Sequence, residues 1–336
     1  MKQKFEIVRF QGQIYLSFVL LNNILFNMKM IKKWTINKIV VASVSLFLLI
    51  MFYLIPTTPN INTEVVEENK DLKENIVYLL DNDNYVSRVV TYYDELDIVS
   101  IIKDKIDKLT NSDINGFYTL IPKNTILKSI KVEKDNVYLD FNNELLNVNK
   151  YISEEMIESI IYSITEINGL NNIYITVDSK ELKYIPNTNK ELKYPLTRKY
   201  GINKKYDIDS FDNIDTTTVF FSKTTNDNVY YVPVSYITNT SSDKIDIIIS
   251  ELTSSVNSQD NLNSYVSNNI ELLNYNIEDD KFNLVFNEYI FGDMENNIIL
   301  EEVKYVIASS IFENYDVKKV VFNTKDMNNI SEIVKK

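Results

Sequence analysis

The chain repeats a hairpin-forming stretch, and this internal repeat constrains its fold more than any other feature. The first copy runs from Gly116 to Asn142 and the second from Asn261 to Asn287. Apolar and polar residues alternate in both copies, the period-2 pattern of strands with one buried side. The five matched inward pairs are Ile130 and Tyr275, Val132 and Ile277, Val137 and Phe282, Leu139 and Leu284, and Phe141 and Phe286. The repeat therefore predicts two folded units of one kind.

The segments around each hairpin follow one order of elements. In the first unit we predict strands at 75–80 and 85–93, a helix at 96–109, the hairpin, a helix from Ser153 to Gly169, and a strand at 173–177. In the second unit we predict strands at 218–221 and 230–236, helices at 245–252 and 303–311, and a strand at 320–322. The predicted class is α+β, with two ββαββαβ units that each carry both helices on one face of a small mixed sheet.

The length of 336 residues suits two such modules with connecting segments. The predicted layout is a cytoplasmic N-terminus at 1–38, a transmembrane anchor at 39–55, a spacer at 56–73, a first domain at 74–182, a polar linker at 183–215, a second domain at 216–328 and a tail at 329–336. An alternative for the linker is an irregular strand that it adds to either unit.

The anchor is predicted from Ile39–Ile55, a run of 17 residues without a charge. This length is at the lower limit for crossing a bilayer. Lysines precede the run and glutamates follow it, so the positive-inside rule places the N-terminus in the cytoplasm and the bulk of the chain outside a cell membrane that it crosses once. A cleaved signal peptide and a buried core helix are the alternatives. We further expect translation to start at Met28 or Met30; otherwise the early segment is a short membrane-surface helix.

The composition removes several classes of chemistry. The chain has no Cys and no His, which excludes disulfides, cysteine nucleophiles, Ser-His-Asp triads and the usual zinc and haem sites. Residues 1–38 hold seven basic groups and one acidic group, which leaves 28 basic and 46 acidic groups and a formal charge of −18 on the remainder. A surface this acidic repels nucleic acid. We expect no catalytic residue, no cofactor, no metal ion and no nucleic-acid partner.

Two carboxylate patterns need a separate explanation. Asp207 to Asp212 resembles a calcium loop, but Asp212 stands where an EF-hand needs Gly and Thr218 stands where it needs Glu. The pairs Asp81 with Asp83 and Asp279 with Asp280 fall in predicted hairpin turns, where Asp is favoured for turn geometry, and we expect both pairs to lie on exposed tips. Because paired carboxylates can hydrolyse a glycan, a carboxylate glycan hydrolase remains a remote alternative.

Three stretches of the first unit carry a family resemblance: Lys108-Leu109-Thr110, the run from Leu120 to Thr125, and the run from Ile160 to Asp178. These stretches resemble the GerM domain, which is found in envelope proteins linked to sporulation and spore germination. The second unit matches this pattern more loosely, through the run from Val306 to Thr324. The resemblance implies a non-enzymatic module, similar to small α+β domains that assemble side by side, and supplies no catalytic residues.

The alternate positions of the two hairpins give a candidate interaction surface. These outward positions are Leu127, Ser129, Lys131 and Tyr138 in the first unit and Leu272, Asn274, Asn276 and Val285 in the second. Mixed surfaces of this kind suit a reversible interface. We therefore expect a membrane-anchored scaffold outside the cytoplasm that binds envelope or sporulation-complex proteins or forms a homo-oligomer. The alternative is a module that binds peptidoglycan.

Overall fold

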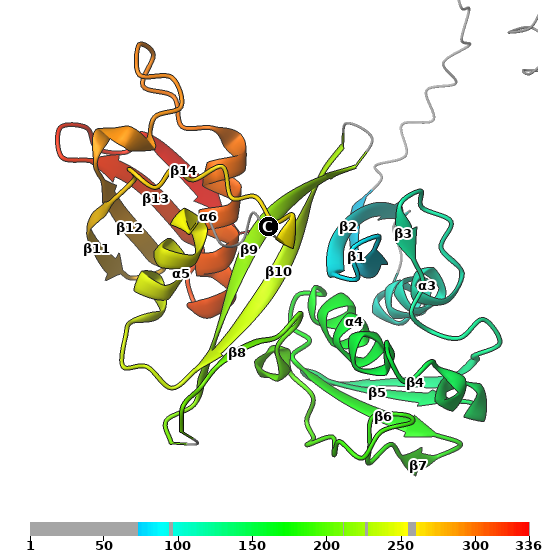
Figure 1. Ribbon diagram of the computed structural model, residues 1–336. Helices are drawn as coiled ribbons and strands as arrows, with labels where there is room; N and C mark the ends of the chain where they lie inside the picture. The colour runs from blue at the N-terminus through cyan, green and yellow to red at the C-terminus, as the bar shows by residue number, and fades with distance from the viewer. Residues whose placement is uncertain (1–72, 94–96, 211, 226–227, 255–259, 336) are drawn as a thin grey trace, which may run out of the picture. The chain divides into compact units, whose positions relative to one another are not determined.

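The computed structural model describes residues 73–93, 97–210, 212–225, 228–254 and 260–335 (Figure 1). The predicted cytoplasmic segment at 1–38, the anchor at 39–55 and all of the spacer at 56–73 except Lys73 lie outside these residues. Within the described ranges, no helix is both long enough and apolar enough to cross a membrane.

The first repeat contains the predicted order of strands and helices, with short additions. Its elements are β1 (Lys73–Asp81), β2 (Val86–Tyr93), α3 (Ile98–Asn111), β3 (Phe117–Tyr118), β4 (Leu127–Glu133), β5 (Asn136–Phe141), the 3-10 helix η1 (Asn143–Asn147), α4 (Ser153–Thr165), β6 (Asn172–Val177) and β7 (Lys180–Glu181). Asp97 begins α3 by accepting hydrogen bonds from the first-turn amides of Val99 and Ser100.

The second repeat has the same order. Its elements are β9 (Asp215–Thr225), β10 (Asn228–Thr238), α5 (Lys244–Thr253), β11 (Leu272–Glu278), β12 (Lys281–Phe286), the 3-10 helix η4 (Glu288–Ile290), α6 (Glu301–Asn314), β13 (Lys319–Thr324) and β14 (Ser331–Val334). The α+β class is thus confirmed, and both repeats build their own buried cluster of apolar side chains.

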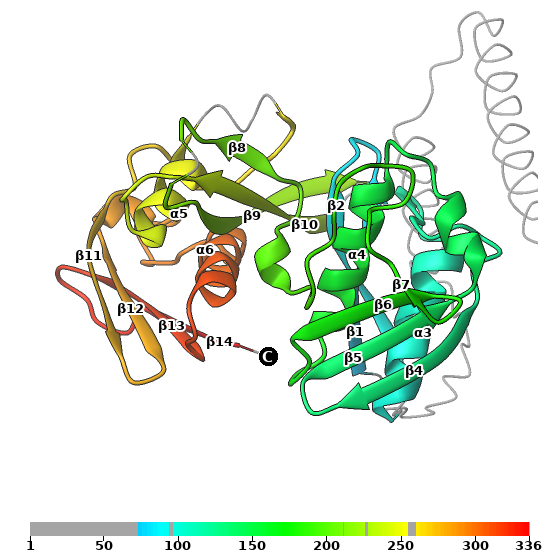
Figure 2. The same cartoon turned by 90° about the horizontal axis from the view of Figure 1, so that it is seen from below.

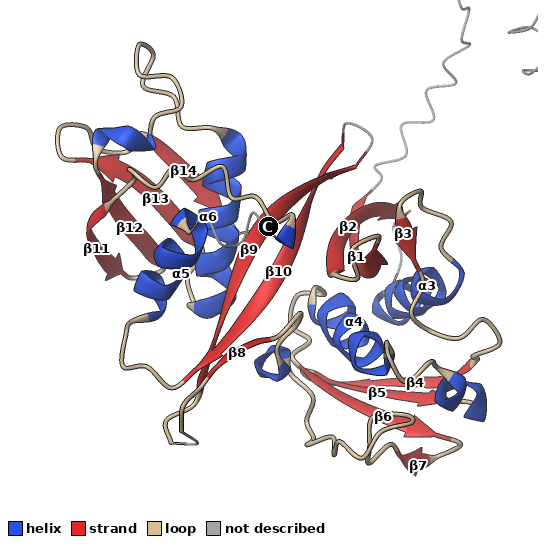
Figure 3. Ribbon diagram, viewed as in Figure 1, coloured by secondary structure: helices blue, strands red, loops and turns tan. Residues whose placement is uncertain are grey.

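The expectation of one sheet per repeat is wrong, because the strands of each repeat divide between two sheets. In the first repeat β4, β5, β6 and β7 form one four-stranded sheet (Figure 2), while β1 and β2 belong to another. Helices α3 and α4 lie between these layers and contact strands of both (Figure 3). In the second repeat β11 to β14 form a four-stranded sheet of their own. Strands β9 and β10 pair with each other and belong to the same sheet as β1 and β2.

Serine side chains on the second helix of each repeat explain this division. The backbone amide of Tyr78 in β1 donates to the Ser163 hydroxyl of α4 over 2.9 Å, and the Ser159 hydroxyl donates to the Tyr78 carbonyl. In the second repeat the Phe220 amide in β9 donates to the Ser310 hydroxyl of α6, also over 2.9 Å. These side chains satisfy the strand edge where another strand would otherwise pair. The strand edge is closed at these positions, so the pairs β1–β2 and β9–β10 stay separate from the four-stranded sheet of their own repeat.

The repeated hairpin has the predicted register in both copies. Ile130 pairs with Leu139 in β4 and β5, and Tyr275 pairs with Leu284 in β11 and β12. Leu139 and Leu284 are fully buried, as predicted. The inward prediction is wrong for Ile277, which is 47% exposed next to the turn of strand β11.

An asparagine after each hairpin makes the same contacts in both copies. The Asn142 side chain accepts from the Ile126 amide and donates to the Asn124 carbonyl. Asn287 does the same with the Glu271 amide and the Asn269 carbonyl. The internal repeat therefore extends to individual hydrogen bonds.

The segment at 183–215, expected to be a polar linker, packs against both repeats. Its apolar side chains Ile185, Leu192, Leu196 and Ile202 are buried in the core cluster of the first repeat. It contains the 3-10 helix η2 (Arg198–Tyr200) and the strand β8 (Lys205–Asp207), which pairs parallel with β10. This matches the alternative in which the segment adds a strand to one of the repeats.

A partly buried arginine of this segment joins the two repeats. The Arg198 guanidinium donates to the Glu166 carboxylate over 2.9 Å and to the Thr165 hydroxyl, and it also contacts the Glu313 carboxylate of α6. Burial alone would raise the pKa of Glu166, but Arg198, Arg88 and the Tyr78 hydroxyl lower it to about 2. One cation therefore neutralises carboxylates from both repeats.

A buried lysine makes a second ionic contact between the repeats. The Lys223 ammonium of β9 lies 2.9 Å from Asp81 and 2.6 Å from Asp83, in the turn after β1. Asp81 also accepts from the Tyr230 hydroxyl and is 1% exposed. The expectation that this carboxylate pair lies on an exposed tip is therefore wrong for Asp81, because the second repeat covers the turn.

The serine contacts give a test of the fold. Ser163→Ala and Ser310→Ala should each lower the free energy of unfolding by about 1–3 kcal/mol, because each leaves a buried amide without a partner. Urea unfolding of residues 69–336 followed by circular dichroism measures this loss. Ser250→Ala, at an exposed position on α5, serves as the control and should change stability by less than about 0.5 kcal/mol.

The arginine contact gives a test with a pH dependence. Arg198→Met should cost about 1.5–3 kcal/mol near neutral pH, because it removes a charged hydrogen-bond donor from two partly buried carboxylates, and Arg198→Lys should cost less. The folded pKa of Glu166 lies below its unfolded value, so its contribution is present above about pH 4 and is lost as the pH falls towards 2. The stability gap between the native chain and Arg198→Met should therefore narrow on acidification. A gap that is constant from pH 7 to 3 would contradict this assignment.

Candidate functional site

The predicted interaction surface lies on the outer faces of the two four-stranded sheets, the faces turned away from the helices. Ser129, Lys131, Asn274 and Asn276 are exposed there, and Tyr138 and Val285 are half-buried. None of these observations shows a bound partner, so the interface remains a prediction.

Two of the eight predicted interface residues lie on the opposite face. The β4–β5 register shifts between Leu127 and Ser129, and Leu127 packs against the core. The β11–β12 register shifts at the matching place, and Leu272 packs against the core of the second repeat. A β-bulge inserts one residue and so reverses the faces on one side of it. Simple alternation along the strand therefore misplaced Leu127 and Leu272.

The outer face of the first repeat carries a row of stacked tyrosines. The ring centroids of Tyr138 and Tyr174 are 4.7 Å apart and those of Tyr174 and Tyr194 are 5.9 Å apart, with nearly parallel planes. The Lys131 ammonium lies 5.6 Å from the Tyr138 ring centroid. The Tyr194 hydroxyl donates to the Ile175 and Leu182 carbonyls and so fixes the end of the row.

The stacking limits what this row can bind. Sugars bind aromatic residues by lying against the ring face, yet Tyr174 has a tyrosine ring on each side. The Tyr138 ring lies between Tyr174 and the Lys131 ammonium. The rings therefore offer their edges outward, together with the ammonium of Lys131, which a 2.7 Å contact ties to Glu133. Such a surface suits contact with another protein better than stacking of a glycan.

The outer face of the second repeat has no such row among its described residues. The register places Asn283 opposite Val321, where the first repeat has Tyr138 opposite Tyr174. The Asn276 amide donates to the Glu278 carboxylate, and the Asn323 amide donates to the Leu284 carbonyl. The two repeats share a fold but present different chemistry.

The carboxylates singled out in the sequence each contact a neighbouring side chain. The hydrogen bond from Lys223 lowers the pKa of Asp83, so this carboxyl stays ionised beside its partner. Asp279 and Asp280 lie in the β11–β12 turn, where Lys318 is 3.7 Å from Asp280. The Asp209 carboxylate of the apparent calcium loop accepts from the Asn239 amide. No cluster of three or more metal-ligating side chains occurs in the described ranges.

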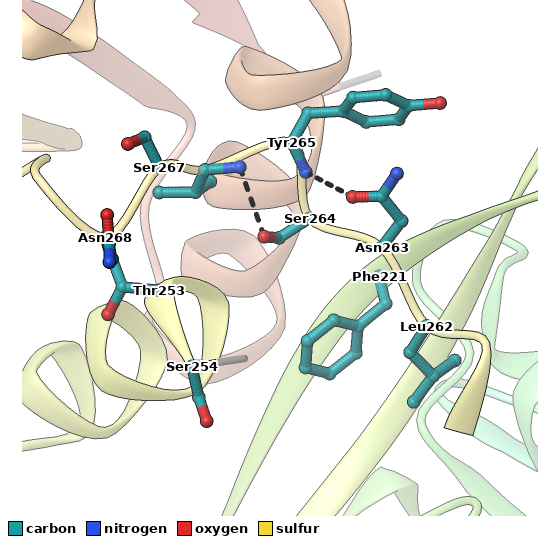
Figure 4. A pocket seen from close by; sticks show the side chains of 10 residues that line it. Phe221, Thr253, Ser254, Leu262, Asn263, Ser264, Tyr265, Ser267 and Asn268 are labelled. Atoms are coloured by element: carbon teal, nitrogen blue, oxygen red, sulfur yellow. Dashed lines mark hydrogen bonds between the residues drawn. The ribbon is translucent and has the colours of Figure 1, made fainter. Parts of the chain in front are cut away.

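Two surface clefts are present in the described part of the chain. The first, about 360 Å³, lies beside the segment from Leu262 to Asn268 (Figure 4). Its lining offers hydroxyl and amide groups, of which the Ser264 and Asn263 side chains already accept from the Val266 and Tyr265 amides. The second cleft, about 460 Å³, lies in the first repeat between η1 and residues 177–188.

The sequence analysis did not predict the ionic contacts of Arg198 and Lys223, although the rarity of Arg in the sequence indicates where one of them lies. The chain contains three Arg among its 35 basic residues. Both Arg in the described ranges lie near Glu166: Arg198 bonds to it, and Arg88 lowers its pKa while lying over the Tyr305 ring. In a chain that otherwise uses Lys, an Arg marks a place where a planar guanidinium with several donors is needed.

Comparison with known proteins agrees with this structure. The family model "Germane: Sporulation and spore germination" matches residues 76–183. Among curated proteins, the spore germination protein GerM of Bacillus subtilis (strain 168) is 29% identical over 226 residues, which is 66% of this chain and 61% of that protein. This chain thus aligns with less than two thirds of that relative's length.

A solved structure extends the similarity to both repeats. The tandem GerMN domains of the sporulation protein GerM from Bacillus subtilis match with a TM-score of 0.69 and 25% identity. The match covers 77% of this chain and 93% of that structure, a larger share than one repeat could supply. The chain is therefore similar over both repeats to a protein with tandem GerMN domains.

Proposed function

We propose that this protein acts in sporulation or spore germination as a membrane-anchored scaffold outside the cytoplasm, through binding to other proteins or to itself. The proposal draws its biological role from the similarity to GerM of Bacillus subtilis. The proposed mode of action rests on one observation. The outer faces of the two four-stranded sheets carry both polar and apolar side chains, and these side chains differ between the repeats.

The outer face of the first repeat has features of a protein-binding surface. Tyrosine is enriched in interfaces because its ring is rigid and amphipathic, and Tyr138 and Tyr174 are both half-buried. The Asp140 carboxylate next to them is fixed by the Thr176 hydroxyl at 2.6 Å and the Ser179 amide at 2.8 Å. The hydrogen bond from Thr176 lowers the pKa of Asp140, which keeps this side chain charged. A preorganised face of this kind loses little entropy on binding.

The location outside the cytoplasm is testable because the chain contains no Cys. Tyr151→Cys places a thiol at a position that is 77% exposed. A membrane-impermeant maleimide should label this variant in intact cells, since the uncharged run at 39–55 and its lysine flank predict that residue 151 is outside. Labelling that requires cell lysis would reverse the topology. The parent chain without Cys is the control for background.

The role is testable in a sporulating organism that carries this gene. A strain with Lys131→Glu and Tyr138→Glu should form or germinate spores as poorly as a deletion strain, because charge on the outer face blocks contact without disturbing the core. The measurement is the yield of heat-resistant, germinating spores at equal protein level. Lys150→Glu, also exposed but away from this face, should leave the yield unchanged. Normal yield from the deletion strain would refute the proposed role.

A further inference from the structure

The cleft of about 360 Å³ in the second repeat is lined by polar groups that carry no charge. Thr253 and Ser254 come from the end of α5, while Asn263, Ser267 and Asn268 come from the segment before β11 (Figure 4). All five side chains are exposed or half-buried, so a ligand can reach them. None of the ten described residues that line the cleft is charged.

A serine side chain separates the two elements that form this cleft. In the first repeat the Ile121 amide donates directly to the Leu109 carbonyl at the end of α3, over 3.2 Å. In the second repeat the Ser264 hydroxyl lies between the matching groups: it donates to the Leu252 carbonyl and accepts from the Val266 amide. Because a hydroxyl replaces a direct backbone contact, this segment lies further from the end of its helix than in the first repeat.

Tyr265 is a second difference between the repeats. The hairpin offset of 145 matches it with Leu120, which is 2% exposed, whereas Tyr265 lines the cleft and is 42% exposed. Its φ of 56° places a bulky residue in the left-handed region, which costs free energy unless neighbouring contacts hold it there. The Asn263 side chain supplies such a contact by accepting from the Tyr265 amide at 2.9 Å. Backbone strain at an exposed aromatic residue points to a role in binding.

The ring of Tyr265 has a free face, in contrast to the tyrosine row of the first repeat. Figure 4 shows this ring standing clear of the other labelled side chains. No other ring and no cation stacks on it within the described ranges. Tyr174, by comparison, has a tyrosine ring on each side. The free face of Tyr265 can therefore pack against the C–H groups of a sugar.

The amides of the cleft are available for hydrogen bonds to a ligand. The Asn268 side chain and the NH2 group of Asn263 have no hydrogen-bond partner in the described part of the chain. The Ser267 hydroxyl accepts from the Asn269 amide and keeps its own proton to donate. A carboxamide both donates and accepts, so these groups can bond to the hydroxyl and acetamido groups of a sugar.

The charge and burial around the cleft restrict the class of ligand. Residues 216–328 contain 17 acidic and seven basic side chains, so the second repeat repels polyanions and anionic lipid. The described lining offers no basic side chain to hold an anion. Its apolar members Phe221, Leu262 and Val266 are buried, so they offer no surface to the apolar side chains of a peptide. These properties favour a neutral chain of polar units.

We propose that this cleft binds a neutral glycan, with Tyr265 packing against one sugar and with Asn263 and Asn268 hydrogen-bonding to the groups that the sugar carries. The cleft volume is at the lower end of the range of about 300–1,000 Å³ that is usual for ligand sites, which suits a short segment of a longer chain. This site goes beyond the proposed scaffold function, because it attaches the second repeat to a polysaccharide while the outer face of the first repeat contacts protein.

Calorimetric titration of the full-length chain in detergent with chitohexaose tests the proposal. This oligosaccharide is neutral and carries hydroxyl and acetamido groups. We expect saturable binding that Tyr265→Ala and Asn268→Ala each weaken about tenfold, which corresponds to the loss of about 1.4 kcal/mol. Tyr265→Phe keeps the ring and should bind as the parent chain does. Tyr289→Ala removes a tyrosine that is 53% exposed outside the cleft, and it should leave binding unchanged.

Several outcomes would overturn the proposal. One is the absence of binding by the parent chain, and another is equal binding by the parent chain and the two alanine variants of the cleft. Displacement of chitohexaose by polyglutamate would also overturn it, because the cleft would then accept an acidic peptide. The variant with Lys131→Glu and Tyr138→Glu should still bind chitohexaose, so the glycan site and the scaffold function can fail separately.

Discussion

The hydrogen bond between a helix serine and the backbone of a strand edge determines how each repeat is built. Because Ser163 binds Tyr78 and Ser310 binds Phe220, the edges of β1 and β9 are satisfied by side chains at these positions, and β1 pairs with the short strand β3 only at Leu80 and Asp81. In the first repeat α4 is consequently enclosed between two sheets, and ten of its thirteen residues are buried. A helix with one polar, solvent-exposed face could not lie between two sheets in this way.

The enclosed helices leave each four-stranded sheet with one free face. In the first repeat that face carries the tyrosine row from Tyr138 to Tyr194, and in the second it carries asparagines such as Asn274 and Asn276. At matched strand positions the two faces differ only in side chains, and the segment at 183–215 adds Tyr194 to the first face. A tandem of this kind offers two binding chemistries from one fold, which suits a scaffold with more than one contact.

Much of this architecture could be predicted from the sequence because alternation and helical spacing are local signals. The two hairpins and the four helices follow from such patterns, as the register of Leu139 and Leu284 shows. The two-sheet arrangement could not be predicted, because Ser159 and Ser163 look like a solvated stripe until the strand edge that they satisfy is known. The bulge that turns Leu127 inward could not be predicted either, because one extra residue reverses the two faces of the strand without altering its composition. Burial of Asp81 depends on Lys223, which is distant in the sequence.

The joint between the repeats has a mechanical consequence. Each repeat closes its own apolar core, while the joint between them combines a short pairing of β2 with β10 and the ionic contacts of Arg198 and Lys223, with an aromatic contact of Phe117 and Tyr230 beside them. A force that pulls the two repeats apart is carried through this joint. A few ion pairs and one short strand pairing can separate and reform without exposing a core, whereas an opened core must refold. Under tension the joint should therefore yield first and recover first, so the chain can lengthen and recoil while both repeats stay folded.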